Sequence, residues 1–68
     1  MHNRLRELRV DAGLVQGALA ARAGVSPTVI GLVEKHNYEP SLTIKHKIAK
    51  ALKCQVSDIW PQAEAAVA

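Results

Sequence analysis

Small and apolar residues recur at a fixed spacing in the segment QGALAARAGVSPTVIGLVE, which begins at residue 16. Ala20 lies four residues before Gly24, and Ile30 and Val33 follow six and nine residues after that glycine. A small side chain lets two short helices cross closely, and a glycine accepts the positive φ of a tight turn between them. The apolar underside of the first helix and the turn is completed by Leu19, Ala23 and Val25. The pattern predicts a helix-turn-helix over residues 16–35, a unit that binds duplex DNA.

The composition favours a small all-α domain. The 68 residues predict one domain, 1–68, and 49% of them are apolar, but Tyr38 and Trp60 are the only aromatic residues. A core of Leu, Ile, Val and Ala suits helix packing better than a sheet. The single Cys54 excludes an internal disulfide and a cysteine-based zinc site, and it fits a cytoplasmic protein. The net charge of +3 permits a polyanionic partner without requiring one.

Other kinds of chemistry find little support in the residue pattern. The chain has no Ser/His/Asp set, no plausible pair of catalytic carboxylates and no glycine-rich phosphate loop, so no catalytic residue is expected. His36 and His46 lack metal-ligand spacing with each other and with Cys54, and we expect them to be solvated. No apolar run approaches the roughly 20 residues of a membrane span. We therefore expect no metal, cofactor, small-molecule ligand or membrane contact.

Capping residues divide the chain into five expected helices. Gly13 and Gly24 end the first two, Ser26 with Pro27 begins the third, and Ser41 caps the fourth. A connector, residues 36–41, separates the third helix from the fourth, and its Asn37 tolerates a left-handed turn. A final short helix around 58–60 is capped by Gln55 or Ser57 and stopped by Pro61. The expected ranges of the first four helices, and of the C-terminal tail, are 3–12, 16–23, 26–35, 42–52 and 61–68.

Four phrases of the sequence resemble one known family. They are RLRELR, GLVQGALAARAGVSPTVI, VEKHNYEPSL and IAKALKCQVSDIW, and together they span residues 3–60. In these phrases the chain is similar to the phage repressor and Cro family, also called the Xre family, and most of all to its short stand-alone members, which act as homodimeric repressors. The resemblance implies a compact five-helix domain whose second and third helices form the helix-turn-helix. It also implies that the third helix enters the major groove of double-stranded DNA and that a dimer reads two half-sites.

The resemblance assigns roles to individual residues. Gln16 and the backbone N–H of Gly17 would meet a DNA phosphate at the start of the second helix. The positions that would face the bases are Ser26, Pro27, Thr28, Gly31 and Leu32. The positions that would approach the opposite phosphates are Lys35, Asn37 and Tyr38. Arg9 and Glu34 match a buried ion pair between the first and third helices, and Arg9 could also contact a phosphate.

The chain departs from the family where the family reads bases. Val15 replaces a polar N-cap and cannot cap a helix, and Gly17 and Gly31 each cost about 1 kcal/mol relative to alanine. Only Ser26 and Thr28 remain as polar readers, so strong direct readout by Arg–guanine or Gln–adenine contacts is missing. Two functions stay open: a homodimeric repressor, of which a restriction-modification controller and an antitoxin-like autoregulator are possible kinds, or a helical protein-interaction module that has lost operator reading.

The C-terminal third offers two further surfaces. The lysines at 45, 47, 50 and 53 are expected on a solvated helix face, with Lys45 the best candidate for a DNA contact among them. Cys54 is expected to be a small apolar filler. A dimer interface is expected at Val56, Ile59 and Trp60, because a small core would not enclose all three. The alternatives are that Val56 and Ile59 belong to the core and only Trp60 is available, or that Trp60 covers the core.

Overall fold

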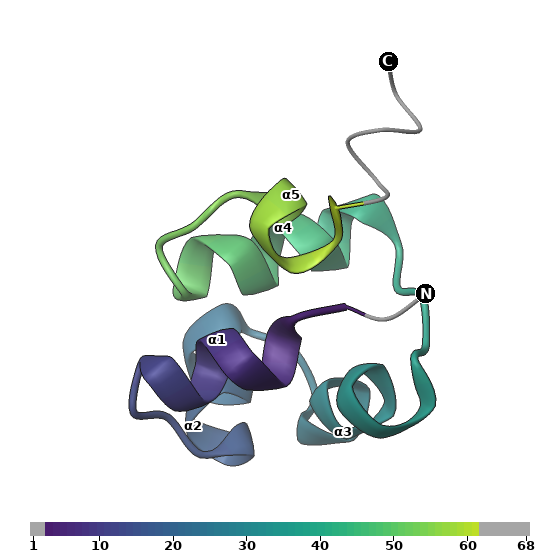
Figure 1. Ribbon diagram of the computed structural model, residues 1–68. Coiled ribbons are helices and arrows are strands. Elements are labelled where there is room, and N and C mark those ends of the chain that lie inside the picture. The colour runs from purple at the N-terminus through teal and green to yellow at the C-terminus, as the bar shows by residue number, and fades with distance from the viewer. Residues whose placement is uncertain (1–2, 62–68) are drawn as a thin grey trace.

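Five helices account for most of residues 3–61, which are the residues that the computed structural model describes. The order of the helices is α1 (Leu5–Asp11), α2 (Gln16–Ala23), α3 (Pro27–His36), α4 (Leu42–Ala51) and α5 (Val56–Ile59) (Figure 1). No strand occurs within this described range. The predicted all-α, five-helix class is confirmed, whereas most of the predicted tail, from residue 62 onwards, lies outside the described residues.

The capping residues act where the sequence placed them. Gly24 ends α2 with a φ of 72°, and Asn37 ends α3 with a φ of 53°, both in the left-handed region. The Ser26 hydroxyl accepts a hydrogen bond from the Thr28 N–H at 3.0 Å, and the Ser41 hydroxyl caps α4 in the same way. These local signals fix the ends of α2, α3 and α4 to within a residue or so of the predicted ranges.

The first helix begins two residues later than predicted, with Arg4 as its N-cap residue and Asn3 one residue before it. The Asn3 side-chain oxygen accepts a hydrogen bond from the Leu5 N–H at 2.9 Å. Its amide nitrogen donates to the Val33 carbonyl at 2.9 Å, which connects the start of α1 to α3. The next residue, Arg4, donates its N–H to the carbonyl of Ile59 in α5 at 2.8 Å, so the segment before α1 also contacts α5.

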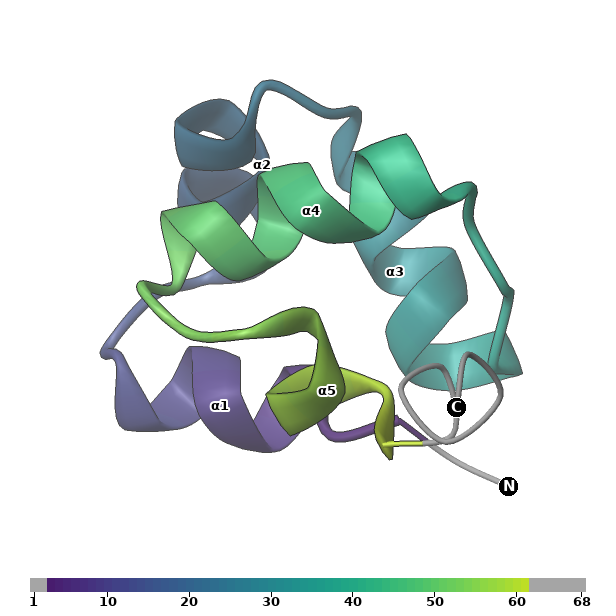
Figure 2. The same cartoon turned by 90° about the horizontal axis from the view of Figure 1, so that it is seen from above.

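The core lies where α2 packs against both α3 and α4, with α1 on α3 and α5 on α4 (Figure 2). In the view of Figure 1, α4 and α5 lie above α1, and α2 and α3 lie below it. Within residues 3–61 the hydrophobic core is aliphatic apart from one indole, and its buried residues are Leu5, Leu19, Ala20, Ile30, Val33, Ile48, Ala49, Ala51, Ile59 and Trp60. Ala20 is almost completely buried at the crossing of α2 with α3, as the spacing of the motif requires.

The core encloses most of the C-terminal apolar cluster. Ile59 has no exposed surface and Trp60 only 3%, which agrees with the alternatives that Ile59 belongs to the core and that Trp60 covers it. The Trp60 ring lies beside Lys45 of α4 and is part of the same core as the aliphatic side chains. Val56 is half-buried and is the one member of the predicted interface that reaches the surface.

Lys45 is also placed differently from the prediction. Lys45 is only 6% exposed. Its Nζ lies 5.5 Å from the centre of the Trp60 ring and forms an ion pair with Glu39 of the connector. A lysine can bury its aliphatic stem against an aromatic face while its ammonium finds a carboxylate. Lys45 therefore attaches the connector and α5 to α4, and it belongs neither to a solvated face nor to an open DNA footprint.

Candidate nucleic-acid interface

The turn between α2 and α3 fixes how the third helix is presented. After the left-handed Gly24, the Val25 N–H donates back to the Ala20 carbonyl at 3.0 Å, which closes the end of α2. Ile30 and Val33 are fully buried, and their spacing puts one face of α3 against α2. The opposite face of α3 is consequently directed away from the core.

That outward face carries the residues predicted to read bases. Ser26, Pro27 and Thr28 are exposed at its start, Leu32 is 38% exposed one turn later, and Gly31 is half-buried between them. A side-chain Cβ added at Gly31 would meet no atom within 4 Å, so no contact inside the protein requires a glycine there. The structure brings this predicted set together on one helix face of limited polarity.

A buried polar cluster joins α1, α2 and α3 beside this face. The Arg9 Nε and Nη2 donate to the two oxygens of Glu34 at 2.7 and 3.1 Å, and Nη1 donates to the Leu14 carbonyl at 2.7 Å. The side chains of Arg9 and Glu34 are 13% and 3% exposed. The hydrogen bond to Glu34 raises the pKa of Arg9, so the guanidinium keeps its positive charge. The predicted ion pair is present and in two-point geometry.

Gln16 takes part in this cluster, which sequence reasoning did not anticipate. Its Nε2 donates to Glu34 Oε1 at 3.1 Å, the same oxygen that accepts from Arg9 Nη2. A side-chain amide nitrogen carries two N–H groups, so one is given to Glu34 and one can serve another acceptor. The ion pair therefore orients the residue that was predicted to meet a phosphate.

A hollow of about 210 Å³ opens at this cluster. It is lined by Arg6, Arg9, Gln16, Glu34 and Lys35, which bring side chains from α1, α2 and α3 to one place. Val15, which precedes α2, provides no side-chain hydrogen bond to the helix start, so no side chain caps the first N–H groups of α2. Sequence reasoning missed Arg6; its position three residues before Arg9 on the same helix was the signal that could have found it.

The connector positions the remaining predicted contacts. Lys35 and Tyr38 are exposed, Tyr38 to 47%, and the Tyr38 N–H donates to the Leu32 carbonyl at 3.2 Å. Asn37 accepts a hydrogen bond from Asn3 Nδ2 at 3.4 Å, so its side chain is engaged with the segment before α1. Lys35 and Tyr38 flank α3 on the side of the connector, whereas Gln16 lies at the start of α2.

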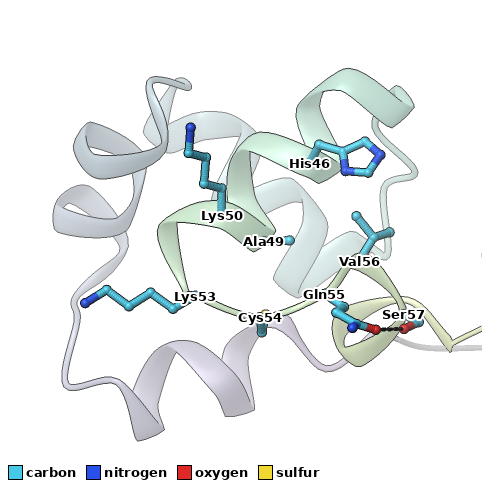
Figure 3. A pocket seen from close by; sticks show the side chains of 8 residues that line it. All are labelled: His46, Ala49, Lys50, Lys53, Cys54, Gln55, Val56 and Ser57. Carbon is cyan, nitrogen blue, oxygen red and sulfur yellow. Dashed lines mark hydrogen bonds between the residues drawn. The ribbon is translucent and has the colours of Figure 1, made fainter.

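A second, larger hollow lies away from α3, between α4 and α5. It measures about 550 Å³, and Figure 3 shows its lining residues: His46, Ala49, Lys50, Lys53, Cys54, Gln55, Val56 and Ser57. Cys54 is half-buried against the core, as predicted for a filler, and burial raises the pKa of its thiol. Among residues 3–61 no group of three or more His, Cys, Asp or Glu side chains could hold a metal ion. No helix in the same range has the length and apolar character of a membrane span.

Comparison with known proteins agrees with this geometry. The profile of the helix-turn-helix family matches residues 5–59 of the chain. An HTH-type transcriptional regulator from Methanothermobacter thermautotrophicus is 46% identical over 61 residues, which cover 88% of this chain and 88% of that protein. A regulator from Archaeoglobus fulgidus is 37% identical over 60 residues, covering 88% of this chain and 86% of that protein. The structure is similar to the restriction-modification controller protein C.AhdI from Aeromonas hydrophila, with a TM-score of 0.76 and 38% identity over 81% of this chain and 83% of that one.

An all-helical domain that presents α3 next to a cationic hollow defines the class of DNA-binding helix-turn-helix regulators. The chain belongs to the helix-turn-helix family, since the family profile and relatives of more than 30% identity cover most of its length. The resemblance to the phage repressor and Cro (Xre) family is thereby confirmed.

Proposed function

We propose that the chain is a sequence-specific regulator of transcription that acts as a homodimeric repressor and places α3 in the major groove of duplex DNA. The observation that carries this proposal is the position of the 210 Å³ cationic hollow beside the exposed face of α3. A helix in the major groove needs a phosphate contact at its flank, because phosphates fix the register in which bases are read. The hollow supplies such a contact.

One DNA phosphate would occupy the hollow. Arg6 and Lys35 supply positive charge, the second N–H of Gln16 donates, and the uncapped start of α2 adds the Gly17 N–H. Arg9 is committed to Glu34 and Leu14 and acts as a positioning residue for Gln16. In this proposal the ion pair serves the DNA contact without touching the DNA.

The bases would be read by few groups. The Ser26 hydroxyl already accepts from the Thr28 N–H but can still donate, the Thr28 hydroxyl is exposed, and Leu32 can meet a thymine methyl. Pro27 and the glycine at 31 allow close approach of the backbone. At the C-terminal end of α3, further phosphate contacts would come from Asn37 and Tyr38, next to Lys35 of the hollow.

Selection of duplexes from a random pool tests the proposal, followed by binding measurements with two variants. Gln16→Ala should weaken binding to all duplexes about equally, because a phosphate contact carries no sequence information. Thr28→Ala should change the preferred base at one position per half-site. If the pool yields no preferred sequence, or if Gln16→Ala reshuffles the preference, these roles are wrong.

The homodimer would form at the α5 side of the hollow between α4 and α5, around Val56, and would leave Lys50 and Lys53 on the opposite side of this hollow outside the interface. Val56 is a half-buried apolar residue of its lining, and Ile59 and Trp60, which follow it in the sequence, are buried in the core. Val56→Glu should give a folded monomer in sedimentation at micromolar concentration, with weaker operator binding, because a dimer would bring the two carboxylates together. Trp60 is unsuitable for this test, since a charge at a residue 3% exposed would unfold the protein. A Val56→Glu variant that remains a dimer places the interface elsewhere.

A DNA-binding regulator and a protein-interaction module can be distinguished by experiment. The likeness to C.AhdI, named a restriction-modification controller protein, supports a controller of that kind, which would bind next to restriction-modification genes. The apolar, glycine-bearing face of α3 supports a protein-interaction module instead. A regulator should lose affinity for duplex DNA steeply as salt rises, whereas an apolar protein contact should hardly respond.

A further inference from the structure

A third hollow, of about 480 Å³, lies between the end of α2 and the outer side of α4. Its lining consists of Arg22, Ala23, Lys47, Lys50, Ala51 and Lys53. We call this surface the α2–α4 basic face. Figure 3 shows Lys50 and Lys53 extending from the α4 region on the side of the molecule where α2 lies. No residue of the basic face belongs to the proposed operator contacts at the hollow of Arg6, Gln16 and Lys35.

The cations of the basic face are uncompensated. The ion pairs of residues 3–61 involve Arg4, Arg9 and Lys45, and none involves a residue of this face. No acidic side chain lines the hollow, and its four cations are all exposed. Four of the nine Lys and Arg residues of the chain thus gather on one surface, where no carboxylate of residues 3–61 lines the hollow. Such a concentration of charge attracts a polyanion and not a second copy of itself.

The lack of large apolar side chains on the basic face distinguishes between a nucleic acid and an acidic protein as its partner. Protein interfaces have an apolar or aromatic centre, whereas a nucleic-acid backbone offers phosphates and needs none. The exposed large apolar side chains of the described chain are Val10, Val15, Leu32, Tyr38 and Leu42, all outside this hollow. The floor between the cations consists of Ala23 and Ala51. These observations favour a phosphate backbone over an acidic protein.

We propose that the α2–α4 basic face binds the backbone of a second segment of duplex DNA without regard to its sequence. The proposal rests on the proposed operator binding only in that α3 holds the first segment. The operator-bound protein would then hold two duplexes at once, one read by α3 and one held by Arg22, Lys47, Lys50 and Lys53. Such a contact is electrostatic and falls steeply with salt.

Capture of a second duplex tests the proposal. The duplex that the wild-type protein selects from a random pool is fixed to beads and saturated with protein, and free protein is washed away. A fluorescent 24-base-pair duplex of random sequence is then added at about 0.1 M salt. We expect the wild-type complex to capture it and Arg22→Gln/Lys47→Gln to lose capture by about tenfold, while both bind the first duplex equally. Glutamine keeps helix propensity and removes only the charge.

A matched pair of single variants controls for net charge. Lys47→Gln and Arg4→Gln each remove one positive charge, from exposed positions on α4 and before α1. Lys47→Gln should weaken binding of the random duplex and lower the slope of log K against log salt by about one, and Arg4→Gln should leave both nearly unchanged. Equal losses in the two variants would show a net-charge effect and overturn the proposal.

Other outcomes decide between partners. Capture that survives in Arg22→Gln/Lys47→Gln overturns the proposal, and so does stronger competition by polyglutamate or by single-stranded RNA than by duplex DNA. If the pool yields no selected duplex, the free protein is titrated with the random duplex. A loss of that binding in the double variant then supports the basic face while the proposed operator reading fails.

Discussion

Two cationic regions of this molecule differ in whether their positive charges are paired with carboxylates. At the junction of α1, α2 and α3, the Arg9 side chain is 13% exposed, and its guanidinium donates hydrogen bonds to Glu34 and to the Leu14 carbonyl. On the α2–α4 basic face, the exposed cations of Arg22, Lys47, Lys50 and Lys53 form no ion pair with a carboxylate of the described chain, residues 3–61. The first region holds three helices together, and the second contributes nothing visible to the fold.

The contrast follows from burial. A charge withdrawn from water must be paired and hydrogen-bonded, so the residues of the junction are fixed by one another. An exposed charge stays hydrated and is free to meet a partner outside the protein. Substitutions at the junction should therefore change stability first, and those on the basic face should change binding alone.

The largest expected effect is at the buried ion pair. Arg9→Ala or Glu34→Ala should each lower the free energy of unfolding by roughly 3–5 kcal/mol, because either change leaves a buried charge without its partner. The double change Arg9→Ala/Glu34→Ala should cost less than either single change, because it leaves no unpaired charge behind. Denaturation curves of the three variants measure this, and strictly additive losses would show that the two residues do not interact.

A smaller loss is expected at Lys45, a cation that is buried yet paired with an exposed carboxylate. Lys45→Ala should lower the free energy of unfolding by about 1–2 kcal/mol, since it removes the stem and the ammonium that cover the Trp60 ring. Lys45→Met keeps the stem and should lose less. Thermal melts with tryptophan fluorescence check both, and identical losses in the two variants would exclude the ring contact as a contributor.

Gly31→Ala should have an effect of similar size and opposite sign. The space around its Cβ position is empty to 4 Å, and alanine favours a helix by about 1 kcal/mol, so the free protein should become more stable. Binding to the selected duplex should weaken, because the methyl group would separate α3 from the bases. Calorimetry of folding and a binding titration measure the two effects, and unchanged binding would show that DNA does not approach Gly31.

The smallest effect on the fold is expected on the basic face. Arg22→Gln/Lys47→Gln should melt at the temperature of the wild-type protein within error, because both residues are exposed and unpaired. Circular dichroism melts at low and moderate salt test this. A clear rise in melting temperature at low salt would indicate that repulsion among these cations strains the fold, and the two regions would then differ less than their burial suggests.

Much of the fold could be predicted from short-range signals. Gly24, Ser26 and Asn37 act on backbone groups only a few residues away, so their roles in ending or starting a helix are readable along the chain. The predictions for the roles of DNA-contacting residues rest on the family resemblance and stay predictions. The sequence left the burial of Ile59 and Trp60 open, because burial depends on how many elements converge on a side chain and not on its neighbours in sequence.

By itself the sequence determined the helices, their caps and the apolar faces that cross at Ala20, since propensity, capping and periodicity are properties of neighbouring residues. Only the tertiary structure decided which polar groups meet. Arg9 and Glu34 are 25 residues apart in the sequence, and Gln16 donates to the same carboxylate. The Lys45 ammonium lies over the Trp60 ring. Spacing cannot reveal such contacts, because they arise when separate helices pack and each buried charge must find a partner within reach.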